Sequence, residues 1–254
     1  MKISAIVLNK NEEAMIRDCL ESLKWTDEII VFDTGSTDNS LNVAREFSAK
    51  IFKNKGNDFA SWRTEALDEA KGEWVFYLDP DERVTPLLKK EIEAEINKDD
   101  QAFSVFVMPR RNFLLGKELR FGGWSPDYVK RLFLRKDLEK WRGELHEEPV
   151  FRGEIGKLSS PMIHLQPEKI EPALAKSIRW SGIEANLLYQ SGHPLITWWR
   201  VLRMGLTTLF ERLIKKQGFR DGVEGFIESI YQAFHTMIVY LKLWELQDTD
   251  KLNK

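Results

Sequence analysis

The sequence predicts an α/β fold, because short apolar strands alternate with helices along its first third. Residues 3–8, 28–33 and 73–78 are rich in β-branched and aromatic side chains, and each run ends in a polar cluster. Strands that alternate with helices build right-handed βαβ units around a parallel sheet. We therefore expect a mostly parallel sheet of Rossmann-like type, flanked by helices, with the carboxyl ends of its strands on one edge.

The segments between these strands have helical spacing or turn residues. The helix after the first strand has its apolar face at Ile16, Cys19, Leu20 and Leu23. The turn at residues 34–38 offers N-cap side chains for a helix through Phe47. A short strand near residues 51–52 and a helix over residues 62–71 complete the alternation.

The pattern changes after residue 101. Residues 102–109 and 128–135 read as strands without crossover helices, which predicts mixed or antiparallel pairing, and an irregular stretch at 112–127 joins them. Residues 172–246 are helical in pattern. We expect a catalytic α/β domain over residues 1–170 and a helical C-terminal extension over residues 171–254.

Composition excludes several classes of protein. The 254 residues carry a formal charge of −2, so no overall basic field suggests a nucleic-acid partner. Cys19 is the only cysteine, which excludes an internal disulfide and a cysteine-based zinc cluster, and its apolar stripe predicts a buried, inert thiol. No run of about 18 apolar residues is present. We expect a cytoplasmic protein, either soluble or held on the cytoplasmic face of the inner membrane.

Three polar clusters follow the three main strands, at residues 9–12, 33–38 and 79–82. Parallel strands bring their carboxyl ends together, so the clusters should converge. Asp79 and Asp81 lie two positions apart, and both can reach one Mg²⁺ or Mn²⁺ ion, which takes the rest of its shell from water and phosphates. The alternative is an acidic surface turn around Pro80.

Other phosphate-binding and nucleophile motifs are missing from the sequence. Neither Gly-x-Gly-x-x-Gly nor Gly-x-x-x-x-Gly-Lys-Ser/Thr follows the first strand, and a Gly-x-Ser-x-Gly elbow is also absent. A phosphate-containing substrate would therefore be held through a metal ion.

Three segments, "ISAIVLNKNE", "EIIVFDTGSTDNS" and "GEWVFYLDPDERV", resemble the nucleotide-binding half of family 2 glycosyltransferases with the GT-A fold. Further segments, "NDFASWRTEAL", "YVKRLFLR", "WRGELHEEP" and "KKQGFRDGVEGFIESIYQAF", are similar to bacterial lipopolysaccharide-core β-glucosyltransferases. The resemblance implies metal-dependent, inverting transfer from a nucleotide-sugar donor, with UDP expected, to a glycan or glycolipid of the cell envelope.

Carried over to this sequence, the resemblance places nucleotide-binding side chains at Asn9, Asn11, Glu12 and Asp33. It implies that Arg63 bridges base and phosphate, although a surface helical arginine is the alternative. Arg131 is expected to face either the phosphates or a carboxylate.

The same resemblance makes Asp79 and Asp81 the metal ligands, as the two carboxylates of an Asp-x-Asp motif. Glu82 is expected to cap the next helix or to support the metal shell. Trp124, in the aromatic stretch 121–128, is expected either to stack on an acceptor sugar or to plug the core.

The catalytic base is expected in "GELHEEP", residues 143–149. We assign Glu147 as the base and His146 as a metal, phosphate or acceptor contact, with Glu148 as the rival base. The alternative is a solvated strand edge. The remaining histidines, His164, His193 and His235, are expected to be structural.

The helical tail carries two apolar stripes. One lies between Leu195 and Leu213, inside a stretch, residues 195–220, that has six basic residues and one acid, a local charge of +5. The other lies between Phe226 and Leu241. Three uses fit this pattern: mutual packing, contact with an anionic membrane surface, or homodimerisation.

Two rival functions remain at this stage. A nucleotidyltransferase would need a Gly-rich loop with Arg and Lys after the first strand, which residues 9–12 do not supply. A non-catalytic binding protein for envelope glycan assembly would not need the Asp79/Asp81 pair.

Overall fold

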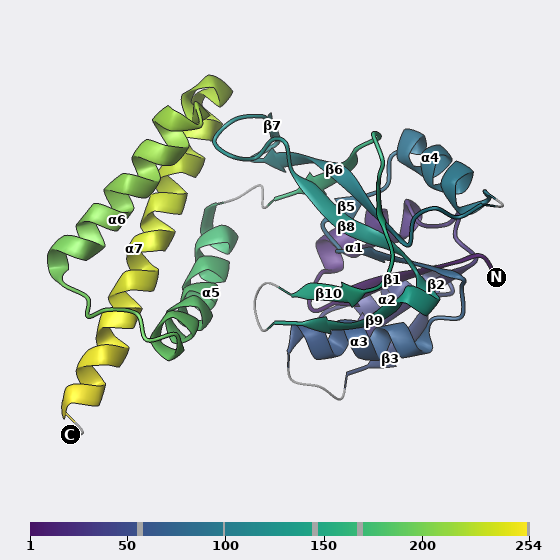
Figure 1. Cartoon of the computed structure of the whole chain (residues 1–254), viewed down its shortest axis with the longest axis horizontal. Coiled ribbons are helices and arrows are strands. Elements are labelled where there is room, and N and C mark those ends of the chain that lie inside the picture. The colour runs from purple at the N-terminus through teal and green to yellow at the C-terminus, as the bar shows by residue number, and fades with distance from the viewer. Residues whose placement is uncertain (55–57, 99, 144–146, 167–169, 253–254) are drawn as a thin grey trace. The chain divides into compact units, whose positions relative to one another are not determined.

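The computed structural model describes residues 1–54, 58–98, 100–143, 147–166 and 170–252 (Figure 1). The chain forms two compact units. The first unit comprises residues 1–111 and 127–165, and the second comprises residues 112–126 and 166–254.

The first unit is built on a sheet with the strand order β3-β2-β1-β4-β8-β6-β12-β5. Its parallel half contains β1 (Ile3–Asn9), β2 (Glu28–Asp33), β3 (Lys50–Lys53) and β4 (Trp74–Leu78). The helices of this unit are α1 (Glu13–Glu21), α2 (Ser40–Glu46), α3 (Phe59–Glu69) and α4 (Pro86–Ile96). The predicted α/β alternation is therefore confirmed.

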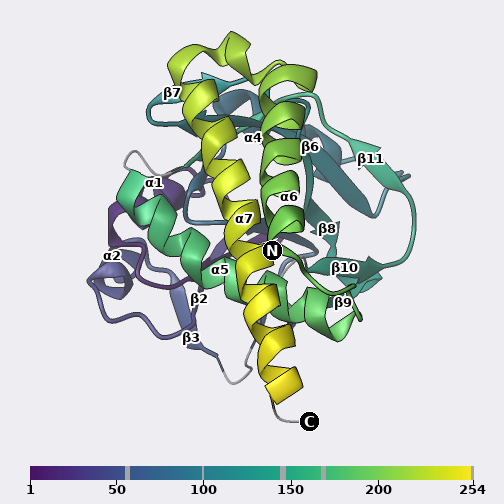
Figure 2. The ribbon, with the colours of Figure 1, turned by 90° about the vertical axis from the view of Figure 1, so that its left-hand side faces the viewer.

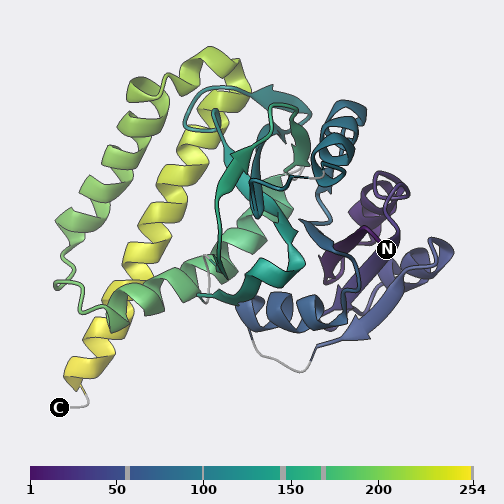
Figure 3. The ribbon, with the colours of Figure 1, turned by 45° about the vertical axis from the view of Figure 1, so that its right-hand side comes forward.

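Helices cover both faces of this sheet, and the period-two alternation of β1 shows how (Figure 3). Ile3, Ala5 and Val7 pack into one core together with apolar side chains of α1, α2 and α4. Ile6 and Leu8 point to the other face and pack against α3. Since both faces are buried, β1 reads as a continuous apolar run, as central parallel strands do.

The second half of the sheet is mixed, as predicted. β8 (Tyr128–Leu134) pairs antiparallel with both β4 and β6 (Val105–Leu114). β11 (Ile155–Lys157) runs parallel to β6, and β12 (Met162–Leu165) pairs antiparallel with β5 (Glu82–Arg83). A separate ribbon joins β9 (Leu138–Arg142) to β10 (Glu148–Phe151), and η1 (Arg135–Asp137) precedes it.

The prediction of an irregular stretch from residue 112 is wrong at its start. β6 continues through Leu114 and forms a hairpin with β7 (Lys117–Leu119). Leu115 and Gly116 both have positive φ, 51° and 81°, which allows the tight turn between the two strands.

The second unit contains the helices α5 (Ile170–Gln190), α6 (Trp198–Phe210) and α7 (Gly222–Leu252), with η2 (Glu211–Lys215) and η3 (Gly218–Asp221) between the last two. Figure 2 shows α6 and α7 side by side. Gly205 permits this approach, because a Cβ there would lie 2.5 Å from Cγ of Met237. Within the described residues, no helix is both long and apolar enough to cross a membrane.

Polar contacts tie residues 112–126 to this helical unit. The carboxylate of Asp221 accepts hydrogen bonds from the backbone N–H groups of Arg120 and Phe121, at 3.0 and 2.8 Å. His235 interacts with Ser177 and with Glu184, both on α5, which confirms the expected packing role of that histidine.

We expect Gly72→Ala to destabilise the protein by about 1–3 kcal/mol, because the added methyl would meet the backbone nitrogen of Ser4 at 2.5 Å. Gly182→Ala is the matched control, since its Cβ would find nothing closer than Nζ of Lys242 at 3.6 Å. A helical Gly→Ala change of that kind should be neutral or stabilising by up to about 1 kcal/mol. Urea unfolding of the two variants compares them, and equal effects would contradict the packing at Gly72.

Candidate active site

The loops after β1 and β2 lie together at the carboxyl edge of the sheet, as predicted. Asn9 and Asp33 are register partners, and both side chains are buried. Nδ2 of Asn9 donates to the hydroxyl oxygens of Ser36 and Ser40, each at 2.9 Å. The backbone N–H of Ser36 donates to Oδ1 of Asp33 at 3.0 Å, so one serine joins both strand ends.

Asn11 and Glu12 shape the first of these loops. Asn11 has a positive φ of 56°, and its Oδ1 accepts from the backbone N–H of Thr37 at 2.7 Å. Glu12 stands at the start of α1, where its backbone carbonyl accepts from Met15 and Ile16. Both residues therefore lie beside Asn9, on the loop that a ligand at this edge would meet.

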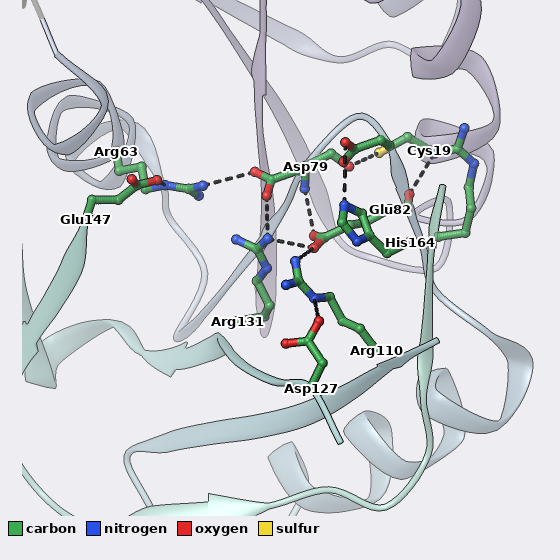
Figure 4. Close-up of polar contacts among 11 residues, drawn as sticks. Cys19, Arg63, Asp79, Glu82, Arg110, Asp127, Arg131, Glu147 and His164 are labelled. Carbon is green, nitrogen blue, oxygen red and sulfur yellow. Dashed lines mark hydrogen bonds and ion pairs between the residues drawn. The ribbon is translucent and has the colours of Figure 1, made fainter. Parts of the chain in front are cut away.

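A buried network of charges follows β4, and Figure 4 shows its members converging on Asp79. Nη2 of Arg63 lies 3.0 Å from Oδ1 of Asp79, while Arg131 contacts the other carboxylate oxygen. Arg131 also lies 2.6 Å from Glu82, and Nε of Arg63 lies 2.8 Å from Glu147. Each arginine thus bridges two carboxylates.

Two further charged residues extend this network away from β4. Arg110 lies 3.2 Å from Oε1 of Glu82 and 2.8 Å from Oδ2 of Asp127. No local sequence pattern marks Arg110 or Asp127 as part of this site, because their relevance arises from the antiparallel β6–β8 pairing.

Arg63 is held in place by its helix and by aromatic rings. α3 begins at Phe59 with a capping box between Asp58 and Ser61, which fixes the start of the helix four residues before Arg63. The guanidinium carbon lies 5.5 Å from the ring centre of Tyr77 and 5.0 Å from that of Trp141. With the side chain 6% exposed, Arg63 is no surface arginine, and that alternative is excluded.

Opposite charges determine the ionisation of this network. Burial alone would raise the pKa of Asp79, but the guanidinium groups of Arg131 and Arg63 outweigh it and hold that pKa well below its usual range. Burial alone would lower the pKa of Arg131, but the carboxylates of Asp79 and Glu82 outweigh it and raise that pKa above its usual range. Asp79 is therefore a permanent anion between two permanent cations.

Asp81 has a different neighbour from Asp79. Its Oδ2 lies 3.6 Å from Nε2 of His164, which reaches it from β12 through the antiparallel β5–β12 pairing. The sequence predicts only a structural role for His164. The sequence does hold one signal of its burial, since His164 lies two residues after Met162 and therefore on the same side of the strand.

The donor atoms at Asp81 suit a divalent cation that completes its shell from water and phosphate. Within the described residues, no group of three or more His, Cys, Asp or Glu side chains is arranged to hold a metal. One carboxylate and one imidazole fit Mn²⁺ better than Mg²⁺, because Mg²⁺ prefers oxygen ligands, and either ion would keep several non-protein ligands. Both carboxylate oxygens of Asp79 are instead engaged by arginines.

Glu82 does not cap the following helix, so the first of its two expected roles is wrong. Thr85 is the N-cap of α4, where its hydroxyl accepts from the backbone N–H of Leu88. Glu82 lies fully buried in β5 and accepts a hydrogen bond from the backbone N–H of Asp79 at 3.0 Å. This hydrogen bond holds the turn that contains Asp79.

The two candidate bases have different surroundings, and Glu144 and His146 lie outside the described residues. Glu147 is 15% exposed and paired with Arg63. Glu148 is 73% exposed, begins β10 and pairs with Lys130 at 2.9 Å. Glu147 therefore belongs to the same charge network as Asp79.

Trp124 belongs to the second unit and is described with it. Its backbone carbonyl accepts from Nδ2 of Asn112 at 3.0 Å, and its side chain lines a mainly apolar cavity with Glu228 and Tyr231.

Cys19 is fully buried in the first unit, and burial raises the pKa of its thiol. This agrees with the inert thiol that the sequence predicts.

Residues 4–144, more than half of the chain, match the family model for glycosyl transferase family 2, so the chain belongs to that family. It is a glycosyltransferase, which sets aside the nucleotidyltransferase and the non-catalytic alternatives.

Individual relatives cover nearly the whole chain. The chain is 24% identical over 260 residues to the lipopolysaccharide core biosynthesis glycosyltransferase LpsC of Rhizobium meliloti, spanning 96% of this chain and 93% of LpsC. It is 26% identical to an uncharacterized glycosyltransferase of Rickettsia conorii, over 96% and 90% of the two chains. Among solved structures, S. aureus TarS in complex with UDP-GlcNAc is similar, with a TM-score of 0.49 and 16% identity. The match covers 98% of this chain and 92% of the TarS chain.

We expect Arg131→Leu to cost about 3–5 kcal/mol of stability, because it would leave the buried Glu82 carboxylate and one oxygen of Asp79 without this cation. Arg152→Leu removes an exposed pair with Glu139 and should change stability by less than about 1 kcal/mol. Urea denaturation at neutral pH measures both. Similar losses in the two variants would argue against a buried charge network.

Proposed function

We propose that this glycosyltransferase moves a sugar, with inversion and with the help of Mg²⁺ or Mn²⁺, from a UDP-sugar to a cell-envelope glycan such as a lipopolysaccharide core. The observation that carries the proposal is the Asp79–Glu82 turn, where Asp81 faces His164 while Asp79 holds two buried arginines. This turn lies at the carboxyl end of β4, where open α/β sheets bind their ligands.

Buried polar atoms near this edge support a nucleotide-sugar donor. Oδ1 of Asn9 and Nη1 of Arg63 are buried and have no hydrogen-bond partner in the described part of the chain. Such atoms are costly unless a ligand satisfies them. In the proposal Asn9 and Asp33 contact the base or ribose, with Asn11 and Glu12 along the loop, and Arg63 and Arg131 lie toward the diphosphate.

The proposal divides the tasks of the two aspartates. Asp81 and His164 would hold the divalent cation, whose role is to offset the charge on the leaving nucleoside diphosphate. Asp79 would position the two arginines. Those cations keep positive charge fixed beside the leaving group without waiting for solvent to rearrange.

Glu147 is proposed as the general base. Its carboxylate would take the proton of the acceptor hydroxyl as the hydroxyl oxygen attacks the anomeric carbon and the bond to the diphosphate oxygen breaks on the opposite face. The contact with Nε of Arg63 fixes the position of this carboxylate. His146, which precedes it, remains a proposed contact to metal, phosphate or acceptor.

The acceptor is proposed from a relative. LpsC is named a lipopolysaccharide core biosynthesis glycosyltransferase, and the alignment covers 93% of its length. Trp124 remains a candidate for stacking on an acceptor sugar, since its ring lines a cavity that also contains the buried carboxylate of Glu228.

Nucleotide binding tests the metal assignment. We expect Mn²⁺ with UDP to raise the melting temperature of the wild type, because a ligand at a hundredfold excess over Kd stabilises the native state by about 2.7 kcal/mol. Asp81→Ala and His164→Ala should lose the metal-dependent part of this shift, while His193→Ala, a histidine of the second unit, should retain it. An unchanged shift in Asp81→Ala would rule out the assigned ligand.

Transfer kinetics test the base. Glu147→Gln should lower kcat by about 10²–10⁴-fold with UDP binding retained, because general-base catalysis contributes that much. Glu148→Gln should stay within a few-fold of the wild type, since that side chain is exposed and paired with Lys130. The reverse order of the two variants would transfer the role to Glu148.

A further inference from the structure

The second unit has an apolar face on α6 that the packing of its helices leaves open. α6 contacts α7 through its buried Val201 and Gly205. The apolar side chains on its other side are between 41% and 75% exposed: Trp198, Trp199, Leu202, Leu206 and Phe210. The α6 stripe is therefore not used for packing against α7.

α7 adds a second open stripe. α5 and α6 both pack on α7, yet several of its large apolar side chains are between 45% and 68% exposed: Val223, Phe226, Ile230, Phe234, Leu241 and Trp244. They are three, four or seven residues apart, so they lie along one side of the helix. Apolar surface of this extent on a folded unit marks an interaction site.

The charges around α6 identify the kind of partner. α6 contains Arg200 and Arg203 and no acid, and residues 195–220 carry a local charge of +5. Trp198 and Trp199 begin the helix in edge-to-face contact, with ring centres 5.9 Å apart. Tryptophan and basic side chains beside an apolar stripe suit the boundary between the headgroups and the acyl chains of an anionic bilayer.

We propose that this face, formed by the exposed apolar residues of α6 and α7, binds the surface of a membrane that contains anionic phospholipids. A second copy of the chain fits less well, because a symmetric contact would bring two regions of charge +5 together. The inference goes beyond the proposed transfer reaction, because it concerns a surface of the second unit alone.

Vesicle binding tests the proposal. We expect the full chain to co-sediment with vesicles of phosphatidylcholine containing phosphatidylglycerol, less so with pure phosphatidylcholine, and less at high salt. Leu206→Ser should weaken binding about tenfold. Leu87→Ser is the matched control, since that leucine is similarly exposed, 66% against 61%, but lies on α4 of the first unit. Arg203→Gln should cost about fivefold on anionic vesicles only.

Three outcomes would overturn the proposal. The first is equal vesicle binding by Leu206→Ser and Leu87→Ser, and the second is no vesicle binding by the wild type. The third is a wild-type dimer, measured by light scattering, that Leu206→Ser dissociates while vesicle binding is absent, which would assign the face to a second copy. Retention of the Mn²⁺–UDP thermal shift by Leu206→Ser shows that the variant is folded, and separates this test from that of the proposed reaction.

Discussion

Asp79 lies between Arg63 and Arg131, and the arrangement of the candidate site depends on this contact (Figure 4). A buried ion is tolerated only when opposite charges and hydrogen bonds replace its water. Because each arginine also pairs with a second carboxylate, Glu147 or Glu82, the network ties α3, β4, β8 and the start of β10 together. Loss of any one member removes a charged partner from each buried residue that it contacts.

This network separates the roles of two carboxylates that look equivalent in sequence. Asp79 has both oxygens engaged by cations, whereas Asp81 faces His164 across the β5–β12 pairing. Equivalent spacing therefore does not imply equivalent chemistry. In the proposed function, a metal ion held by Asp81 and His164 would offset part of the charge of a diphosphate. The guanidinium groups of Arg63 and Arg131, which contact Asp79, would offset the rest.

Much of the fold could be predicted because local patterns and burial agree. The runs at β1, β2 and β4 are apolar on both faces, as strands covered by helices on both sides must be. The convergence of Asn9 with Asp33 followed from parallel pairing alone. β12 and β5 are short, and their pairing joins segments about 80 residues apart. No local pattern could therefore predict that His164 lies beside Asp81.

The sequence by itself determined the α/β class, the three polar strand ends and the family, because these depend on periodicity and on short motifs within contiguous segments. Only the tertiary structure decided which charges meet: Arg63 with Glu147, Arg131 with Asp79, and His164 with Asp81. It also decided that the apolar stripe of α6 stays open. The physical reason is that long-range pairing and the competition among helices for one core are set by the packing of the whole chain, which spacing along it does not encode.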